Sequence, residues 1–557
     1  MTNLTAKVAQ ARLTRRQLAG GAAGLGAAAA IATVPSFGAR QALAQASGGT
    51  LKLPLGASAN VNLNPIGIGT LGAFYLQSCI YDGLVLSSPS WDDIEPGLAE
   101  TWDTSEDGLT YTFHLRQGVK WHDGEPFTSA DVIYTYQTIL TKAIGSYMAS
   151  TLFSVTGAED FFNGTATDVS GLQAPDDNTV VFTLSEPNAS FLFSILTQHS
   201  IIPAHVWKDM PVDEMTKPAS WEKGQIGTGP FKFVEYQPDQ FLKLDPNPDA
   251  WRGAPLLDGI LFVMVGTTPD AYAAALEKGD LDYAGALPAT EYERLSSIDT
   301  LTMYSKPVYN IRFLSVNVSK PYLADARVRQ AIAYAIDRAG IVDAIISYGG
   351  EQTDNLTPSA KWRNENVTKY PFDPEKAKSL LAEAGWDPGQ KLVVSLYYQD
   401  QAHADSIATV QQNLTDVGIN AEVLQLDGSA VQDYYYNNAE FDVMLAGFGV
   451  SPDMDEFSRC FMSDAFWPAG QNAMKYVNPK VDELFLAGRQ TVDEAARKTA
   501  YDEVQVILSD DLPWIPFYNL KLVAGMNTRI QNGDAIVTVW NRPYQWNIEK
   551  VSTSDGK

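Results

Sequence analysis

Apolar and polar residues alternate along several short stretches of this chain, and that pattern predicts β-strands with one buried face. The clearest stretches are residues 109–115, 179–184, 392–398 and 441–446. Between them lie segments in which apolar residues recur at helical spacing, as at Val328, Ile332 and Ile336. Strands that alternate with helices predict an α/β fold rather than an all-β sandwich.

Three of the expected helices carry signals for their ends. Thr128 and Asp131 have capping-box spacing before an apolar run. Asp325 is placed to cap a helix over residues 326–338. Asp373 precedes a proline at the first helical position, and Gly385 follows the last turn, an order that the sterics of helix ends favour.

The first 44 residues predict an export signal. They contain basic but no acidic residues, then an uncharged Ala/Gly-rich run, then small-residue cleavage sites around Ala44 and Ala46. The pair Arg15-Arg16 resembles a twin-arginine signal, which implies the twin-arginine export machinery as a partner. A retained membrane anchor is the alternative, but the run is mostly alanine and is interrupted by glycines and Pro35. We therefore expect a periplasmic protein.

Size and charge narrow the function further. The chain has 557 residues, more than one hydrophobic core of ~250–300 residues supports, so we expect two or three lobes. Its 66 acidic and 40 basic residues give a net charge of -26, which disfavours nucleic acid and anionic lipid as partners. The two cysteines, Cys79 and Cys460, are expected to be separate buried thiols.

No catalytic constellation is recognisable in the sequence. There is no nucleophile elbow, phosphate-binding loop or H-E-x-x-H motif, and the five histidines lack metal-ligand spacing. The G-x-G-x-x-G match at residues 67–72 follows a turn rather than a strand. We expect no enzyme activity, no cofactor and no metal, and an exported hydrolase or a periplasmic chaperone remains the alternative.

Several long segments are distinctive in order and spacing. They are Tyr81-Asp82-Gly83-Leu84, Pro96 to Trp102, Tyr111 to Arg116, Gly118 to Gly124, Gly227 to Phe233, Trp251 to Pro255, Val328 to Arg338, and Tyr370 to Pro374. This series resembles the solute-binding proteins of peptide-type ABC importers, the dipeptide/oligopeptide-binding class of solute-binding protein family 5.

The resemblance implies a two-lobed periplasmic-binding-protein clamp, type II and cluster C-like, with an extra subdomain in the first lobe. The expected domains are, after the signal at 1–44, lobe 1 at 45–80, 205–308 and 519–557, the extra subdomain at 81–204, and lobe 2 at 309–518. It also implies a transient partner, an inner-membrane ABC permease, and we expect a monomer.

The resemblance further implies that the ligand lies in a cleft lined from four places in the chain. The implied ligand-binding residues are Asn60, Asn62, Tyr309, Asn310, Arg312, Tyr436, Phe448, Gly449, Val450, Ser451, Asp453 and Tyr518.

One of these places departs from the family pattern. Peptide-binding members usually read Gly-Trp-x-x-Asp where this chain has Phe448 in place of the Trp and Ser451 in place of the Asp that holds a peptide's amino group. Asp453 or Asp455 could replace that carboxylate, and Arg312 could pair with a ligand carboxylate or phosphate or form a surface salt bridge. The ligand is therefore expected to be a peptide or peptide-like solute, with an oligosaccharide or an opine-like sugar conjugate as the alternative.

Overall fold

A computed structural model describes residues 49–55, 65–66, 71–146, 148–217, 224–449, 452–537 and 547–556. All of them fall in the second of two units into which the chain divides, Ala46–Lys557. The expected export signal, residues 1–44, lies outside the described residues.

The largest sheet has seven strands. Its order is β11-β17-β12-β16-β14-β15, with β13 paired to β17. The bounds are Tyr283–Ala284 (β11), Trp514–Asn527 (β17), Leu301–Val316 (β12), Val443–Gly449 (β16), Lys391–Leu396 (β14), Asn420–Gln425 (β15) and Gly350–Gln352 (β13). Strands β14, β15 and β16 run parallel to one another, whereas β12 and β17 run antiparallel to their neighbours.

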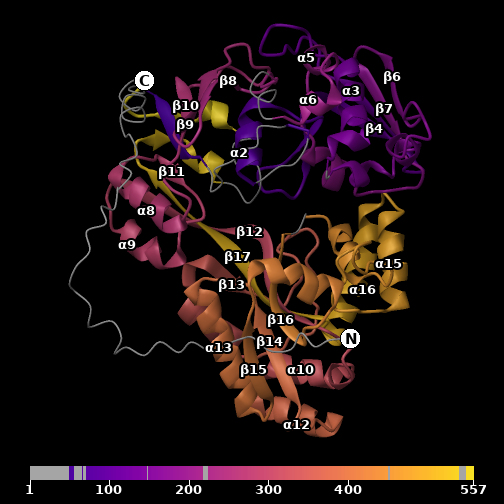
Figure 1. The fold of residues 1–557 in the computed structure, drawn as a ribbon, viewed down its shortest axis with the longest axis vertical. Coiled ribbons are helices and arrows are strands. Elements are labelled where there is room, and N and C mark those ends of the chain that lie inside the picture. The colour runs from indigo at the N-terminus through magenta and orange to yellow at the C-terminus, as the bar shows by residue number, and fades with distance from the viewer. Residues whose placement is uncertain are drawn as a thin grey trace, which may run out of the picture. The chain divides into compact units, whose positions relative to one another are not determined.

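Strands β12 and β17 are the longest in the fold and lie side by side along most of their length (Figure 1). Their pairing comprises two runs, from Leu301 to Pro307 and from Ile311 to Ser315, with one irregularity between the runs and a second one between Arg312 and Phe313. The first run pairs with the same end of β17 that also pairs with β11, whereas the second run lies between β17 and β16. The register of the β12-β17 pair thus changes at two places along its length.

Two four-stranded sheets and two small pairs complete the β-structure. The first sheet, β1-β10-β9-β8, contains Thr50–Pro54, Gly259–Val263, Phe241–Pro246 and Phe231–Gln237. The second, β4-β5-β7-β6, contains Ala99–Thr104, Thr110–Leu115, Thr179–Thr183 and Leu172–Asp176. The pairs are β2-β3, Val85–Ser87 with Ile94–Pro96, and β18-β19, Ile530–Gln531 with Ser552–Thr553.

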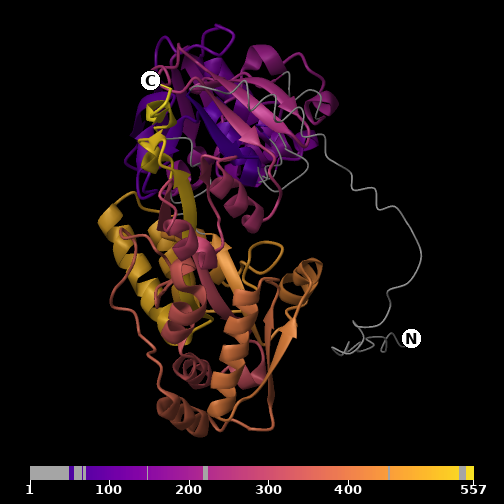
Figure 2. The same ribbon diagram turned by 90° about the vertical axis from the view of Figure 1, so that its left-hand side faces the viewer.

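Helices flank these sheets. The α-helices are Leu71–Ile80 (α2), Ser129–Leu140 (α3), Ala158–Phe162 (α4), Ala204–Trp207 (α5), Val212–Met215 (α6), Pro269–Lys278 (α8), Tyr292–Ser296 (α9), Ala326–Ala335 (α10), Arg338–Ile341 (α11), Pro374–Ala384 (α12), Gln401–Asp416 (α13), Ser458–Phe461 (α14), Pro479–Arg489 (α15) and Glu494–Asp511 (α16). Both views show α15 packed beside α16, and α13 beside β14 and β15 (Figures 1 and 2).

Most predicted elements are confirmed. Strands occur at all four predicted positions, as β5, β7, β14 and β16. Thr128 and Asp131 form the predicted capping box, Asp373 caps α12, and Gly385 ends that helix in the left-handed conformation.

The helix predicted over residues 326–338 is too long. Helix α10 ends at Ala335, and Ile336 is extended. Asp337 explains the break, because its carboxylate accepts a hydrogen bond from the backbone N–H of Gly340 and so caps a second helix, α11. The backbone N–H of Asp337 donates to the side chain of Asn413 instead of to a carbonyl of α10. Asp337 therefore begins a new helix and does not continue α10.

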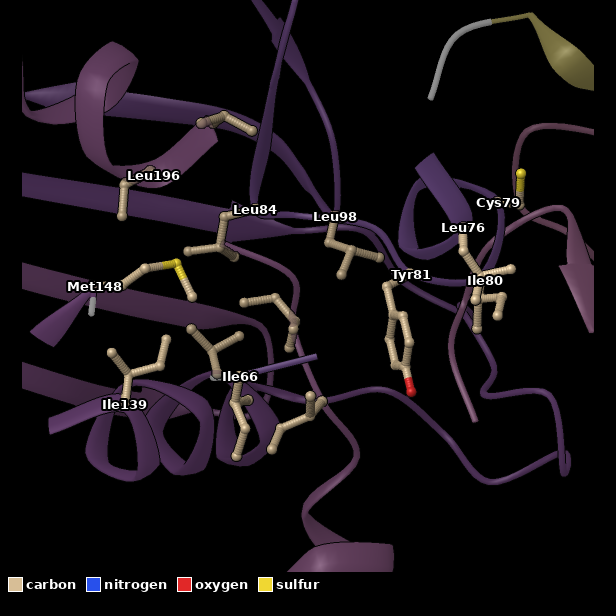
Figure 3. Packing of buried hydrophobic residues seen from close by; sticks show 14 of the residues in the cluster. Ile66, Leu76, Cys79, Ile80, Tyr81, Leu84, Leu98, Ile139, Met148 and Leu196 are labelled. Atoms are coloured by element: carbon tan, nitrogen blue, oxygen red, sulfur yellow. The ribbon is translucent and has the colours of Figure 1, made fainter. Parts of the chain in front are cut away.

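Three hydrophobic clusters form the core. One joins β1, β8, β9 and β10 to the sheet β4-β5-β7-β6; Leu84, Leu98 and Leu196 pack within it (Figure 3). The other two lie on opposite faces of the seven-stranded sheet, as the alternation along β12 requires: Ile311 and Phe313 belong to one, Leu314 and Val316 to the other. Cys79 and Cys460 are both buried, as predicted.

A buried carboxylate connects three of the distinctive motifs. Asp82 is fully buried, and its Oδ2 accepts hydrogen bonds from Thr228 Oγ1 at 2.9 Å and from Trp251 Nε1 at 2.8 Å. Arg252 Nη2 lies 3.1 Å from the other oxygen, Oδ1. Residues about 145 to 170 positions apart therefore meet at one charge, which explains why these sequence segments occur together.

Within the described part of the chain, every helix is too short or too polar to cross a membrane.

The close packing of the Gly227 motif makes a prediction about stability. A Cβ at Gly227 would overlap the backbone carbonyl of Ile80, which closes helix α2 and cannot move cheaply. We expect Gly227→Ala to lower the free energy of unfolding by about 2–4 kcal/mol, measured by urea denaturation. Gly428→Ala is the control, because its Cβ would meet no atom within 4 Å; equal stability losses in both variants would contradict the argument.

His122 makes a prediction about pH. Its Nδ1 accepts from the N–H of Gly227 at 3.2 Å and its Nε2 lies 3.0 Å from the carbonyl of Gly229, a pattern that fits the neutral ring. Burial lowers its pKa from 6.5 to about 4. The folded state therefore disfavours the proton, and this contribution to stability is complete above pH 6.5 and is lost as the pH falls from 6.5 toward 4.

We expect acidification from pH 7.5 to 4.5 to remove about 2–3 kcal/mol through this residue. The pH dependence of urea denaturation should become shallower in His122→Asn but stay unchanged in His114→Asn, whose ring is exposed beside Asp103. An unchanged slope in His122→Asn would show that the buried ring does not carry the effect.

Candidate functional site

One edge of the seven-stranded sheet gathers the ends of its parallel strands. Strands β14, β15 and β16 all end there, and β12 begins its second run at the same edge, with Asn310 opposite Gly449. In open α/β sheets ligands bind outside the carboxyl ends of parallel strands. We therefore take this edge as the candidate site.

Arg312 lies at this edge and carries a positive charge. On β12 it lies opposite Gly447 of β16 and Tyr518 of β17. Its guanidinium carbon is 4.9 Å from the centre of the Tyr398 ring, a cation–π arrangement, and its Nη1 donates to the side-chain oxygen of Asn310. Its buried Nε donates to no described atom. The surface salt bridge considered from the sequence is absent among the described residues.

An aromatic cluster surrounds this arginine. The Tyr398 ring stacks on Tyr397, with centroids 4.3 Å apart, and on His403, with centroids 4.2 Å apart. His403 Nε2 lies 3.1 Å from the hydroxyl of Tyr518. Its Nδ1 lies 2.7 Å from Asp400, and this hydrogen bond lowers the pKa of Asp400 to about 2. The histidine is thus held between a carboxylate and a phenol, with its ring fixed.

Tyr309 connects the edge to the β2-β3 hairpin. Its hydroxyl donates to Asp92 Oδ1 at 2.5 Å, and its ring meets Trp91 edge to face at 5.6 Å. Ser359 Oγ donates to the same oxygen of Asp92 at 3.2 Å. Burial, together with Asp92, raises the pKa of Tyr309, so the phenol remains a donor at physiological pH.

Phe448 forms part of the core at the border of the site. It is almost fully buried, packs against Phe457 and Trp514, and supports the guanidinium of Arg459 at 4.7 Å. Gly449, the last residue of β16, is exposed. Phe448 therefore supports the edge from the core, and Gly449 leaves its backbone exposed at the edge.

Tyr436 lies in the π-helical segment Gln432–Asn437, which precedes β16 in the chain. Its ring packs on Tyr435 and, at 5.3 Å between centroids, on Trp467, which is partly exposed. The contacts of Tyr436 with described residues are thus aromatic and do not include Arg312. Four other expected site residues, Asn60, Asn62, Val450 and Ser451, lie outside the described residues.

The two acidic residues considered as partners for a ligand ammonium already have partners. Asp453 is buried and accepts two hydrogen bonds from Arg497 Nη2, at 2.8 and 2.9 Å. Asp455 accepts a hydrogen bond from Arg489 Nε at 3.0 Å. In this arrangement both carboxylates are neutralised by arginines, so neither offers a free negative charge.

Sequence reasoning did not identify three residues of this edge: Tyr398, His403 and Gly447. Tyr398 ends the strand that was predicted at 392–398, and the rule about carboxyl ends of parallel strands could have pointed to it. His403 and Gly447 become recognisable only through long-range contacts.

The described residues contain no cluster of three or more His, Cys, Asp or Glu side chains that could hold a metal ion.

Comparisons with known proteins identify the family of this chain. The model of bacterial extracellular solute-binding proteins, family 5 Middle, matches residues 93–468. The dipeptide-binding protein of Escherichia coli is 30% identical over 462 residues, which cover 80% of this chain and 84% of that protein. A putative ABC transporter peptide-binding protein of Brucella melitensis is 30% identical over 506 residues, covering 88% of this chain and 91% of that protein.

Solved structures show the same fold. The ABC transporter substrate-binding protein CtaP of Listeria monocytogenes aligns with a TM-score of 0.80 and 26% identity, covering 91% of this chain and 99% of that chain. HbpA2 of Haemophilus parasuis aligns with a TM-score of 0.76 and 26% identity, covering 86% and 96%. The predicted α/β fold of periplasmic binding proteins is confirmed, and the chain belongs to the bacterial extracellular solute-binding proteins of family 5.

Proposed function

We propose that this protein is the periplasmic substrate-binding subunit of an ABC importer, which captures a peptide or peptide-like solute and delivers it to a membrane permease. The observation that carries the proposal is the strand-end edge of the seven-stranded sheet. At this edge, Arg312 lies in an aromatic cluster and has no carboxylate partner among the described residues. The chain also belongs to a family of solute-binding proteins. A shaped site that mixes aromatic surface with few charges suits a small solute.

Peptide is proposed ahead of an oligosaccharide or an opine-like conjugate. The curated relatives at 30% identity are named as dipeptide- or peptide-binding proteins. A relative from Haemophilus influenzae, 27% identical, is named heme-binding protein A, so heme belongs in any ligand panel. The proposed role is capture and release of an unchanged solute, without bond cleavage.

The proposed mechanism is closure of two lobes about the β12-β17 pair. We assign lobe 1 to residues 45–80, 205–308 and 519–557 with the extra subdomain at 81–204, and lobe 2 to residues 309–518. The slip in pairing between Pro307 and Ile311 supports a hinge there, because residues at a slip have fewer ladder bonds to break. Ligand stabilises the closed state only through contacts that it gains there.

Export by a twin-arginine signal over residues 1–44, removal of that signal, and action as a monomer remain parts of the proposal. They rest on the sequence pattern and on the extracytoplasmic family to which the chain belongs.

A ligand panel tests the proposed function. Thermal unfolding and calorimetric titration would be followed with alanine di-, tri- and tetrapeptides, maltotriose, an opine-type conjugate and hemin. We expect saturable peptide binding, with stabilisation of about 2.7 kcal/mol when the peptide is at 100 times its Kd. X-ray scattering should show a smaller radius of gyration with peptide, and mass spectrometry should recover it intact. Binding of a sugar but of no peptide, or a cleaved peptide, would overturn the proposal.

Tyr309 tests the closure mechanism. We propose that its hydrogen bond to Asp92 joins the two lobes, so Tyr309→Phe should destabilise the closed state and weaken ligand binding about tenfold. Tyr322→Phe is the matched control, because the Tyr322 hydroxyl donates to Asp442 at 2.6 Å within lobe 2. Equal affinity losses in both variants, measured by calorimetry, would contradict the assignment.

A further inference from the structure

Arg312 stands apart from the other arginines in how its charge is compensated. Each of the others within the described ranges, apart from Arg329, forms an ion pair with an aspartate or glutamate. Arg329 donates instead to three backbone carbonyls, those of Leu323, Ala324 and Asp511. Among the described arginines, a guanidinium with neither an acidic partner nor a set of backbone acceptors is therefore an exception that requires an explanation.

We propose that Arg312 is the receptor for a carboxylate carried by the solute, and that the protein therefore selects anionic solutes. This inference rests on the proposed function and names the chemistry of its ligand.

The donors of Arg312 fit this role. A guanidinium has five N–H groups, and only Nη1 has a side-chain acceptor, Asn310 Oδ1, among the described residues. That contact and the Tyr398 ring fix the plane of the group without neutralising it. A carboxylate can accept two parallel hydrogen bonds from such a fixed guanidinium, and it would supply the missing charge.

Gly447 provides the room that this arrangement needs. A Cβ at this position would overlap the Arg312 nitrogen Nη1 and would lie 2.6 Å from the Tyr398 hydroxyl. Both atoms are ends of side chains that can move, so a larger residue would displace the receptor rather than break the sheet. The glycine on β16 is thus matched to the arginine opposite it on β12.

The acidic residues near the site point in the same direction. Asp453 and Asp455, which could have held a ligand ammonium, are paired with Arg497 and Arg489. Asp92, which also lies at this edge, forms no ion pair with a described residue, but its Oδ1 accepts hydrogen bonds from the hydroxyls of Tyr309 and Ser359. Next to Arg312, recognition by charge favours a solute carboxylate over a solute ammonium.

A carboxylate can come from the C-terminus of a peptide or from an acidic side chain, and the test separates the two. The probes are trialanine, its C-terminal amide, and the amide of alanyl-glutamyl-alanine, titrated calorimetrically into wild-type protein and variants. We expect the wild type to bind trialanine about ten- to hundredfold more tightly than the neutral-ended amide. Recovery of affinity with the glutamyl amide would assign the carboxylate to a side chain, and no recovery would assign it to the C-terminus.

Arg312→Gln should lose the preference for the free acid and bind acid and amide equally. Gly447→Ala, which keeps the charge but displaces it, should reduce the same preference, whereas Gly428→Ala should not. Arg327→Gln is the charge-matched control, because that arginine is exposed and paired with Asp325. Thermal unfolding of each variant confirms that it is folded.

Two results would overturn the inference in distinguishable ways. If wild-type protein binds trialanine, its amide and the glutamyl amide with equal affinity, or if Arg312→Gln keeps a preference for the carboxylate-bearing peptide, the carboxylate receptor is wrong while the proposed function stands. If wild-type protein binds no peptide of the panel used for the proposed function, that function fails and this inference fails with it.

Discussion

The pairing of β12 with β17 is the constraint on which the rest of the structure depends. These two strands are the long elements of the seven-stranded sheet, and their second run places Arg312 opposite Tyr518 and next to Gly447. Because side chains alternate across a strand, a shift of one residue in this register would exchange the two faces. Arg312 would then enter the cluster that contains Ile311 and Phe313, where an unpaired charge has no solvation. The site therefore exists only in the observed register.

The Asp82 network shows what the recurrent motifs of this family do in this chain. Thr228, Trp251 and Arg252 reach one buried carboxylate from segments far apart in the sequence. A buried charge is stable only when it is paired and hydrogen-bonded, so loss of any of these partners leaves the others unsatisfied. Their joint presence in the sequence is thus evidence for the scaffold, and it carries no information about the ligand.

Local signals in the sequence were reliable where the physics is local. The caps at Thr128 and Asp373 were predictable, because a capping side chain bonds to backbone only a few residues away. The same reasoning failed at Asp337, since an aspartate can continue a helix face or cap a new helix. The second outcome is accompanied by a long-range hydrogen bond from the Asp337 N–H to the side chain of Asn413. Resemblance placed Arg312 in the site, but the sequence could not show that it has no carboxylate partner. That property depends on where every acidic side chain lies in space.

The end of β16 and the loop after it depart from the pattern of peptide-binding members at Phe448 and Ser451, and the charges near the site explain why this need not abolish peptide recognition. The loop after β16 lacks the aspartate that peptide-binding members use for the amino group, and the nearby Asp453 is held by Arg497. A peptide with free ends carries two opposite charges, and a binding site can gain specificity from either one. When the carboxylate that reads the amino end is absent, a fixed guanidinium can still read the acid end, because its planar donors match a carboxylate in geometry as well as in charge. The cost is a change in selectivity, since such a site also accepts anionic solutes that have no amino group.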